Sequence, residues 1–400
     1  MRAPSMMRRA LAAGALALAA LLPVSLPAQA GAAPRDVAEQ LDTAIRQTMA
    51  EAGIPGVVVG LWRPGHRDYV RSFGVADTAT GVPIDEDMYF RIGSETKTFT
   101  VTALLELVDD CLVGLDDPIS KYVHGVRDGE HITLRQLAEM RSGLYSYTED
   151  TDYAKTFLSD PGWQWTPAET LPYGMKHDNR FAPGAAFDYS NSNLVLLGMV
   201  IEKVTGRDVA SVIRDRVLRP SHLGQTLFPA GAEFPAPHPH GYSNQTLDGQ
   251  TADTTDWNPS WAWSAGAMIS TLHDLRVWAK VLATGTLLSA RTQAQRLDGL
   301  PTGFPDTTYG LGILDTHGWI GHNGSLPGYE SVTVYLPEQD ATLVVLLNTD
   351  SSHAGQEPST LLGQAITKVV TPDHVYDGSA TAKLLPITAT GRSRSGPAGG

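Results

Sequence analysis

Ser94 and Lys97 are the first residues in this sequence whose types and spacing suit chemistry. Ser-x-x-Lys places two side chains one turn apart on the same face of a helix. A lysine that is buried beside a serine loses its own proton more easily and can accept the serine's, which makes the serine a nucleophile. The apolar residues that follow predict a buried helix with Ser94 near its N-terminus: Phe99, Leu104, Leu105, Val108 and Leu112. Unpaired N–H groups at such an end suit an oxyanion that forms when the serine attacks a carbonyl.

Ser94 and Lys97 also have a plain interpretation as an N-cap and a solvated charge, and a motif this short arises by chance. Two later motifs favour a site: Tyr189-x-Asn191 before a helical stretch and His322-x-Gly324 before a hairpin. Each has its own structural alternative. Tyr189 would be a core residue with a satisfied hydroxyl, Asn191 a helix N-cap, and Gly324 part of a turn.

The hydrophobic pattern predicts which elements hold these motifs. A helix is expected over 35–53 and a hairpin over 56–74 near the N-terminus, with a second hairpin over 331–347 and a closing helix over 357–370. Between them we expect helices over 132–140, 194–205, 209–218 and 270–282, with long loops over 145–187 and 219–260.

Strands at both ends with helices between them predict an α/β (α+β) fold. The expected architecture is an antiparallel sheet flanked by terminal helices, with an inserted all-helical lobe at roughly 110–265 and a site in the cleft between the lobes. The folded domain would span 35–372, and the small polar residues of 377–400 predict a disordered tail.

Residues 1–30 have the pattern of a secretory signal peptide, with Arg2, Arg8 and Arg9 before an apolar run and Ala28-Gln29-Ala30 as a cleavage site. We therefore expect a secreted, extracellular protein without a membrane span in its mature form. Removing this segment changes the formal net charge from −13 to −16, because it holds three arginines and no acid. An acidic chain argues against nucleic acid as a partner. The single cysteine, Cys111, is expected inside an apolar helix, and no intramolecular disulfide is possible.

The three motifs, in this order, resemble the serine β-lactamase and penicillin-binding-protein superfamily. Tyr-x-Asn in the second motif is similar to the class C branch, and His-x-Gly in the third resembles its secreted D-Ala-D-Ala carboxypeptidases. Further blocks of the resemblance lie at 132–137, 141–145 and 260–267. The resemblance implies a β-lactamase/transpeptidase-like fold, no metal and no cofactor. A monomer is expected.

The resemblance also implies roles for nine residues. Ser94 is expected to be the acylated nucleophile, Lys97 to share the base role, and Tyr189 to relay a proton to the leaving group. The base stays open between Lys97 and Tyr189, since coupled groups do not titrate separately. Asn191 is expected to hold the substrate amide and Lys97, and His322 to position and polarise Tyr189.

The remaining expectations from the resemblance concern the pocket walls. Trp261 would wall the pocket, and Asn323 replaces a hydroxyl residue of the third motif. Gly324 would let a substrate backbone lie close to the strand. The oxyanion hole would be the N–H groups of Ser94 and Ser325.

These roles imply a serine-type D-Ala-D-Ala carboxypeptidase that acts on peptidyl-D-Ala-D-Ala of peptidoglycan, or on another small acyl substrate, with β-lactams as inhibitors. However, the segment 311–321 lacks the arginine that clamps a peptide carboxylate in those relatives. An esterase, a β-lactamase or a D-amino-acid amidase on the same scaffold is therefore the alternative. A binding module without turnover is a third hypothesis, and the three intact motifs argue against it.

Overall fold

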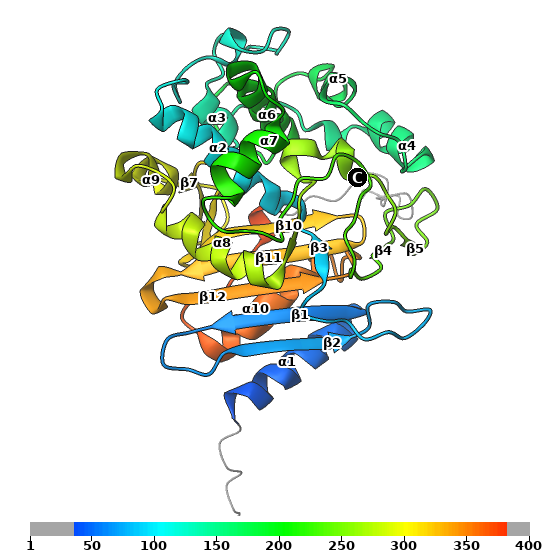
Figure 1. The fold of residues 1–400 in the computed structure, drawn as a ribbon. Coiled ribbons are helices and arrows are strands. Elements are labelled where there is room, and N and C mark those ends of the chain that lie inside the picture. Colours follow the sequence, from blue (N-terminus) through cyan, green and yellow to red (C-terminus); the bar gives the residue numbers. More distant parts are fainter. Residues whose placement is uncertain (1–35, 382–400) are drawn as a thin grey trace, which may run out of the picture. The chain divides into compact units, whose positions relative to one another are not determined.

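The computed structural model describes residues 36–381 (Figure 1). The predicted signal peptide and residues 382–400 of the predicted tail lie outside this range. The chain divides into two units, Met1–Asp36 and Val37–Gly400, and every helix and strand of the described residues belongs to the second.

Eight strands form one antiparallel sheet to which both ends of the chain contribute. Strand β1 near the N-terminus pairs with β12 near the C-terminus, and Val59 lies opposite Val345. This arrangement confirms the predicted sheet. In spatial order the strands are β2 (Tyr69–Gly74), β1 (Gly56–Trp62), β12 (Ala341–Leu347), β11 (Tyr329–Leu336), β10 (Trp319–Leu326), β9 (Leu314–Thr316), β8 (Thr307–Tyr309) and β7 (Leu300–Pro301).

Helices α1 (Val37–Ala52) and α10 (Pro358–Val370) contact each other and cover one face of this sheet (Figure 1). Side chains alternate between the two faces of a strand. Val57 and Val59 of β1 therefore pack with the buried face of α1, whereas Val58 belongs to the apolar cluster on the other face. The terminal helices thus flank the sheet as predicted.

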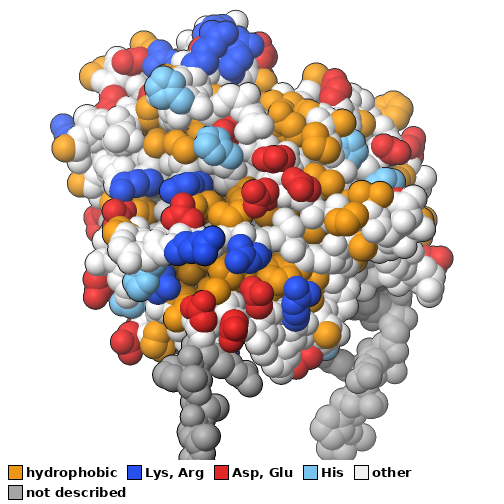
Figure 2. Space-filling view, turned by 60° about the horizontal axis from the view of Figure 1, so that its bottom comes forward, with side chains coloured by type: hydrophobic (Ala, Val, Ile, Leu, Met, Phe, Trp, Pro, Cys, Tyr) orange, Lys and Arg blue, Asp and Glu red, His pale blue; other side chains and the backbone are white. Residues whose placement is uncertain are grey.

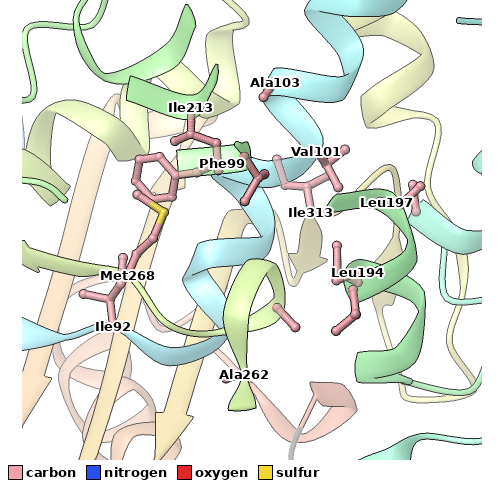
Figure 3. Packing of buried hydrophobic residues seen from close by; sticks show 14 of the residues in the cluster. Ile92, Phe99, Val101, Ala103, Leu194, Leu197, Ile213, Ala262, Met268 and Ile313 are labelled. Atoms are coloured by element: carbon pink, nitrogen blue, oxygen red, sulfur yellow. The ribbon is translucent and has the colours of Figure 1, made fainter. Parts of the chain in front are cut away.

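The opposite face of the sheet carries α8 (Leu272–Thr284) and the helical lobe, with α2 (Thr96–Asp109) at the centre. Almost every residue of α2 is buried, which is typical of a helix surrounded by protein. Figure 3 shows Phe99 directed toward Ile213 and Met268, and Val101 toward Ile313. Phe99 also stacks on Trp278 of α8, with ring centroids 4.1 Å apart.

The other helices of this part of the chain range from five to 15 residues. They are α3 (Leu134–Ala138), α4 (Thr151–Ser159), α5 (Pro167–Met175), α6 (Asn191–Thr205), α7 (Val209–Ile213) and α9 (Ala290–Leu297). Two small antiparallel pairs, β3 (Tyr89–Arg91) with β6 (Ile269–Thr271) and β4 (Tyr242–Ser243) with β5 (Ala252–Asp253), complete the strands of the described residues.

Three local predictions were wrong. The stretch 145–187 is not all loop, since α4 and α5 lie in it. Cys111 is exposed and lies beyond the end of α2 with a φ of 58°, because the helix stops at Asp109. Leu112, expected on the apolar face, is 53% exposed for the same reason.

The first residues of the predicted tail, 377–381, belong to the described structure, and Ala380 and Thr381 are buried. Within residues 36–381 no helix is long and apolar enough to cross a membrane. Figure 2 shows basic and acidic side chains mixed on the face it views, without a large patch of one sign.

Candidate active site

Ser94 and Lys97 lie where a 3₁₀ turn, Gly93–Glu95, leads into α2. Lys97 Nζ is 2.8 Å from Ser94 Oγ and 2.7 Å from the carbonyl oxygen of Ala265. The side chain of Lys97 is fully buried, and this burial holds its pKa well below the usual range. A neutral amine in contact with a serine hydroxyl can accept the hydroxyl proton.

Tyr189 is the third polar group at this point. Its ring centroid lies 4.9 Å from Lys97 Nζ. The hydroxyl is buried without a hydrogen bond to any described residue. Burial raises the pKa of Tyr189, the neighbouring Ser94 hydroxyl lowers it, and the charge of Glu357 raises it further. Tyr189 is therefore a protonated phenol at neutral pH. To act as the base, Tyr189 would need to be a phenolate, which requires a positive charge on Lys97, and burial disfavours that charge.

Asn191 begins α6. It was expected to hold Lys97, but no hydrogen bond joins these two side chains. Its Nδ2 donates to Thr148 Oγ1 at 3.1 Å, and its backbone N–H donates to Ser146 Oγ at 3.1 Å. These bonds tie α6 to the loop before α4. The partner that holds Lys97 is instead the Ala265 carbonyl, in the 260–267 block that also resembled the family.

His322 lies on β10 and is buried with its imidazole toward α2. Its Nε2 is 3.0 Å from the Tyr309 hydroxyl and its Nδ1 is 2.5 Å from the Asn323 carbonyl oxygen. The His322 and Tyr189 rings pack with centroids 6.1 Å apart, but no hydrogen bond joins them. Burial, and to a lesser degree Lys97, lowers the pKa of His322 to about 3, so the imidazole is neutral. His322 thus contacts Tyr189 by packing, and Tyr309 is a partner that the motif search missed.

Asn323 points to the other face of β10, as strand alternation requires. Its Nδ2 donates to Glu357 Oε2 at 3.0 Å, and its Oδ1 accepts from the Thr381 hydroxyl. Glu357 is the N-cap residue of α10, and Thr381 lies in the segment that follows that helix. Both were missed, because the sequence gives no signal that these two segments reach the third motif.

Two glycines allow the turn that carries Ser94 to pack closely against β10. A Cβ on Gly324 would lie 1.9 Å from the carbonyl oxygen of Ile92, and one on Gly93 would lie 2.5 Å from the backbone nitrogen of Ser325. Gly93 also has a φ of +51°. Gly324 is therefore needed for close approach of this chain's own backbone, and its expected contact with a substrate backbone stays a prediction. The contact places Ser94 beside Ser325, as an oxyanion hole requires.

Seven of the nine predicted residues line one pocket, which encloses about 580 Å³ of empty space including the part open to solvent. Lys97 and His322 lie behind its wall. The predicted residues that line it are Ser94, Tyr189, Asn191, Trp261, Asn323, Gly324 and Ser325. Additional wall residues include Thr148, Gln245, Glu357 and Thr381. Among the described residues no Lys or Arg lines the pocket, and Glu357 is its one acid.

A wider groove lies between the β1–β2 turn and α8. None of the described residues that line it is a serine or a cysteine, and Arg276 and Lys280 within it are already paired with Asp68 and Asp340. The pocket at Ser94 is therefore the better candidate, since a nucleophile, a neutral amine and a phenol meet there. This arrangement suits acyl transfer through a covalent serine ester.

Comparisons with known proteins found a matching family model and similar proteins. The family model described as Beta-lactamase matches residues 41–365. Protein flp of Staphylococcus aureus (strain MW2) is 26% identical over 332 residues, and the match covers 80% of this chain but only 64% of that relative's length. A D-stereospecific amidohydrolase from Streptomyces sp. has 31% identity and a TM-score of 0.75 over 84% of this chain and 99% of that one. A D-amino acid amidase from Ochrobactrum anthropi SV3, complexed with L-phenylalanine amide, has 27% identity and a TM-score of 0.74 over 84% and 98%.

Proposed function

We propose that this chain, a serine hydrolase that belongs to the beta-lactamase family, is a D-stereospecific amidohydrolase. It would cleave the amide of a D-amino acid or a short D-peptide through an acyl-enzyme. Structures of two such enzymes resemble the chain over most of its length. A carboxypeptidase on peptidyl-D-Ala-D-Ala was the first expectation, and the amidase was among its alternatives.

The observation that carries the proposal is the charge of the pocket. A carboxypeptidase must bind a substrate carboxylate, which is usually done with a cation. No described Lys or Arg lines the pocket at Ser94, whereas Glu357 does. An amide substrate has no terminal carboxylate next to the scissile bond, so it fits this pocket without a cation.

In the proposed reaction Lys97 is the base in the free enzyme. The lowered pKa of Lys97 and the raised pKa of Tyr189 favour this assignment over the phenolate. Lys97 takes the Ser94 proton as Ser94 Oγ bonds to the substrate carbonyl carbon, which gives a tetrahedral adduct with a negatively charged oxygen. The oxyanion would be bound by the N–H groups of Ser94 and Ser325. The C–N bond then breaks, and the leaving amine receives the proton from Lys97 through the Tyr189 hydroxyl.

Water completes the cycle. It attacks the ester carbon while Lys97 takes one of its protons. The ester C–O bond breaks, Ser94 Oγ recovers a proton from Lys97, and the acid is released. His322 and Tyr309 would act as positioning residues, because their side chains pack against Tyr189 and do not line the pocket.

The test measures ammonia release from D- and L-phenylalanine amide by the wild-type protein and by Ser94→Ala. We expect at least hundredfold faster turnover of the D-amide, and a loss of about 10³-fold or more in Ser94→Ala without a change in Tm. Diacyl-L-Lys-D-Ala-D-Ala is assayed beside it. Faster release of D-Ala from that peptide than of ammonia from the amide would contradict the proposal in favour of a carboxypeptidase.

A further inference from the structure

Glu357 is a buried carboxyl that reaches the wall of the Ser94 pocket, and the reaction described above does not use it. It is 4% exposed. Its hydrogen-bond partner is Asn323, and no Lys, Arg or His of the described chain makes an ion pair with it. A carboxylate that lines a substrate pocket without a cation lacks the charge that would offset its burial.

We propose that Glu357 binds the free α-ammonium group of the substrate, which makes the enzyme specific for amides with an unblocked amino terminus. The inference rests on the proposed amidase function and names the substrate class. An α-amino group lies two bonds from the carbonyl carbon that Ser94 attacks, so its binding group must border the same pocket. Glu357 borders this pocket, and its negative charge raises the pKa of Tyr189.

Asn323 holds Glu357 in a fixed orientation. The Thr381 hydroxyl donates to Asn323 Oδ1, so the amide nitrogen of Asn323 is directed to Glu357 Oε2. A carboxylate locked in this way loses little conformational freedom when an ammonium binds. The family's hydroxyl at position 323 is replaced here by a side chain that can both accept from Thr381 and donate to Glu357.

Acidic groups surround Glu357. Glu330 of β11, Asp350 and Tyr376 face it, and no basic group does among the described residues. Glu330 Oε2 accepts from the Ser359 N–H, while its Oε1 is buried without a hydrogen-bond partner. Burial, and to a lesser extent Asp350, raises the pKa of Glu357 to about 7. A bound ammonium would supply the missing positive charge and ionise Glu357.

The test compares D-phenylalanine p-nitroanilide with its N-acetyl derivative, which lacks the charge. We expect the wild type to favour the free amine by at least tenfold in kcat/KM. Glu357→Gln keeps the shape and the acceptor for Asn323, and it should reduce this preference at least tenfold, mainly by raising KM for the free amine. Equal effects on both substrates, or a wild-type preference for the acetylated one, would overturn the inference.

Glu330→Gln is the matched control, since Glu330 is the neighbouring buried carboxyl but does not line the pocket. Burial raises the pKa of Glu330 well above its usual range. Glu330→Gln therefore replaces a protonated acid with a neutral amide, and the preference for the free amine should stay unchanged. A decrease equal to that of Glu357→Gln would mean that the electrostatic field of the acidic groups attracts the substrate ammonium, rather than a direct contact with Glu357. If Glu357→Gln does not fold, Glu357→Asp replaces it. Because it keeps the charge, we expect a smaller loss of preference, and an unchanged preference would overturn the inference.

Failure of the proposed function gives a different result. In that case p-nitrophenyl acetate is hydrolysed by the wild type but not by Ser94→Ala, while neither D-anilide is cleaved. D-Phenylalanine amide is then used as an inhibitor of ester hydrolysis. A tenfold weaker inhibition in Glu357→Gln would support ammonium binding at Glu357, and equal inhibition in both proteins would overturn it.

Discussion

At the scale of single residues, the surroundings of Lys97 decide the proton chemistry. Lysine is charged at neutral pH when exposed, and only burial makes it a base there. We predict that Lys97→Arg, which stays charged, lowers kcat/KM for D-phenylalanine amide by about 10³-fold or more. For the wild type, kcat/KM should fall as pH falls through the lowered pKa of Lys97, because protonated Lys97 cannot accept the Ser94 proton.

Lys280→Arg is the control for this experiment. Lys280 is exposed on α8, pairs with Asp340 at 2.6 Å and does not line the pocket. Its replacement should leave kcat/KM and the pH profile unchanged. Comparable activity of Lys97→Arg and the wild type would exclude Lys97 as the base and return the role to Tyr189.

Residue types and order were enough to predict that Ser94, Lys97 and Tyr189 lie together, because helical spacing fixes the first pair and motif order adds the third. The contacts of Asn191 and His322 could not be predicted in this way. Their partners, Thr148 and Tyr309, lie in segments without a motif, and only tertiary packing brings these segments to the site. From the sequence, Glu357 was predicted only as the first residue of the closing helix.

At the scale of elements, the site depends on how closely the turn before α2 approaches β10. We predict that Gly324→Ala lowers both activity and stability, since its Cβ would lie 1.9 Å from the Ile92 carbonyl oxygen, and backbone must move. Overpacking of this kind typically costs about 1–3 kcal/mol. Thermal unfolding and kcat/KM of the variant provide the measurement, and we expect at least a tenfold loss of kcat/KM because Ser94 and Ser325 move apart.

Gly224→Ala is the matched control, because a Cβ there meets nothing within 4 Å. Its stability should stay within about 0.5 kcal/mol of the wild type. If Gly324→Ala behaved like Gly224→Ala, the close approach of β10 to the turn at Gly93 would not be required for the site.

Long periodic elements were predicted well and short ones poorly. The helices near both termini and the strands β11 and β12 have repeated apolar positions that fix their type. Helix α4 has only nine residues, and its buried positions, such as Tyr153 and Phe157, are aromatic residues in a stretch rich in Pro and Asp. Its N-cap, Asp150, was a local signal that accepts from two backbone N–H groups and could have indicated the helix.

At the scale of the whole molecule, the two ends of the chain build one sheet and the middle builds the lobe that covers it. This order could be predicted, because strand patterns occur only near both ends. The residues that are buried where the lobe meets the sheet could not be predicted. There Glu95 of the turn before α2 is buried against β11, where Ser331 and Thr333 face it. Neither oxygen of Glu95 makes a hydrogen bond to a described residue.

Glu95 should therefore make the stability of the whole protein depend on pH. Burial raises its pKa to about 8 in the folded chain, against about 4.3 in an unfolded one. The folded state thus holds the proton more tightly. The resulting stabilisation is fully present below about pH 4 and is lost as the pH rises through about 8. We predict that Glu95→Gln, which resembles the protonated acid, removes this loss.

The measurement is Tm between pH 5 and pH 8 for the wild type and Glu95→Gln. The variant should gain several degrees relative to the wild type at pH 8 but not at pH 5, since each kcal/mol shifts Tm by about 2–4 °C in domains of about 150–250 residues. Glu86→Gln, an exposed site, should show no such pH-dependent gain. A constant difference between Glu95→Gln and the wild type at all pH values would mean that Glu95 is charged in the folded protein. Its burial between the lobe and the sheet would then need a cation that the described residues do not provide.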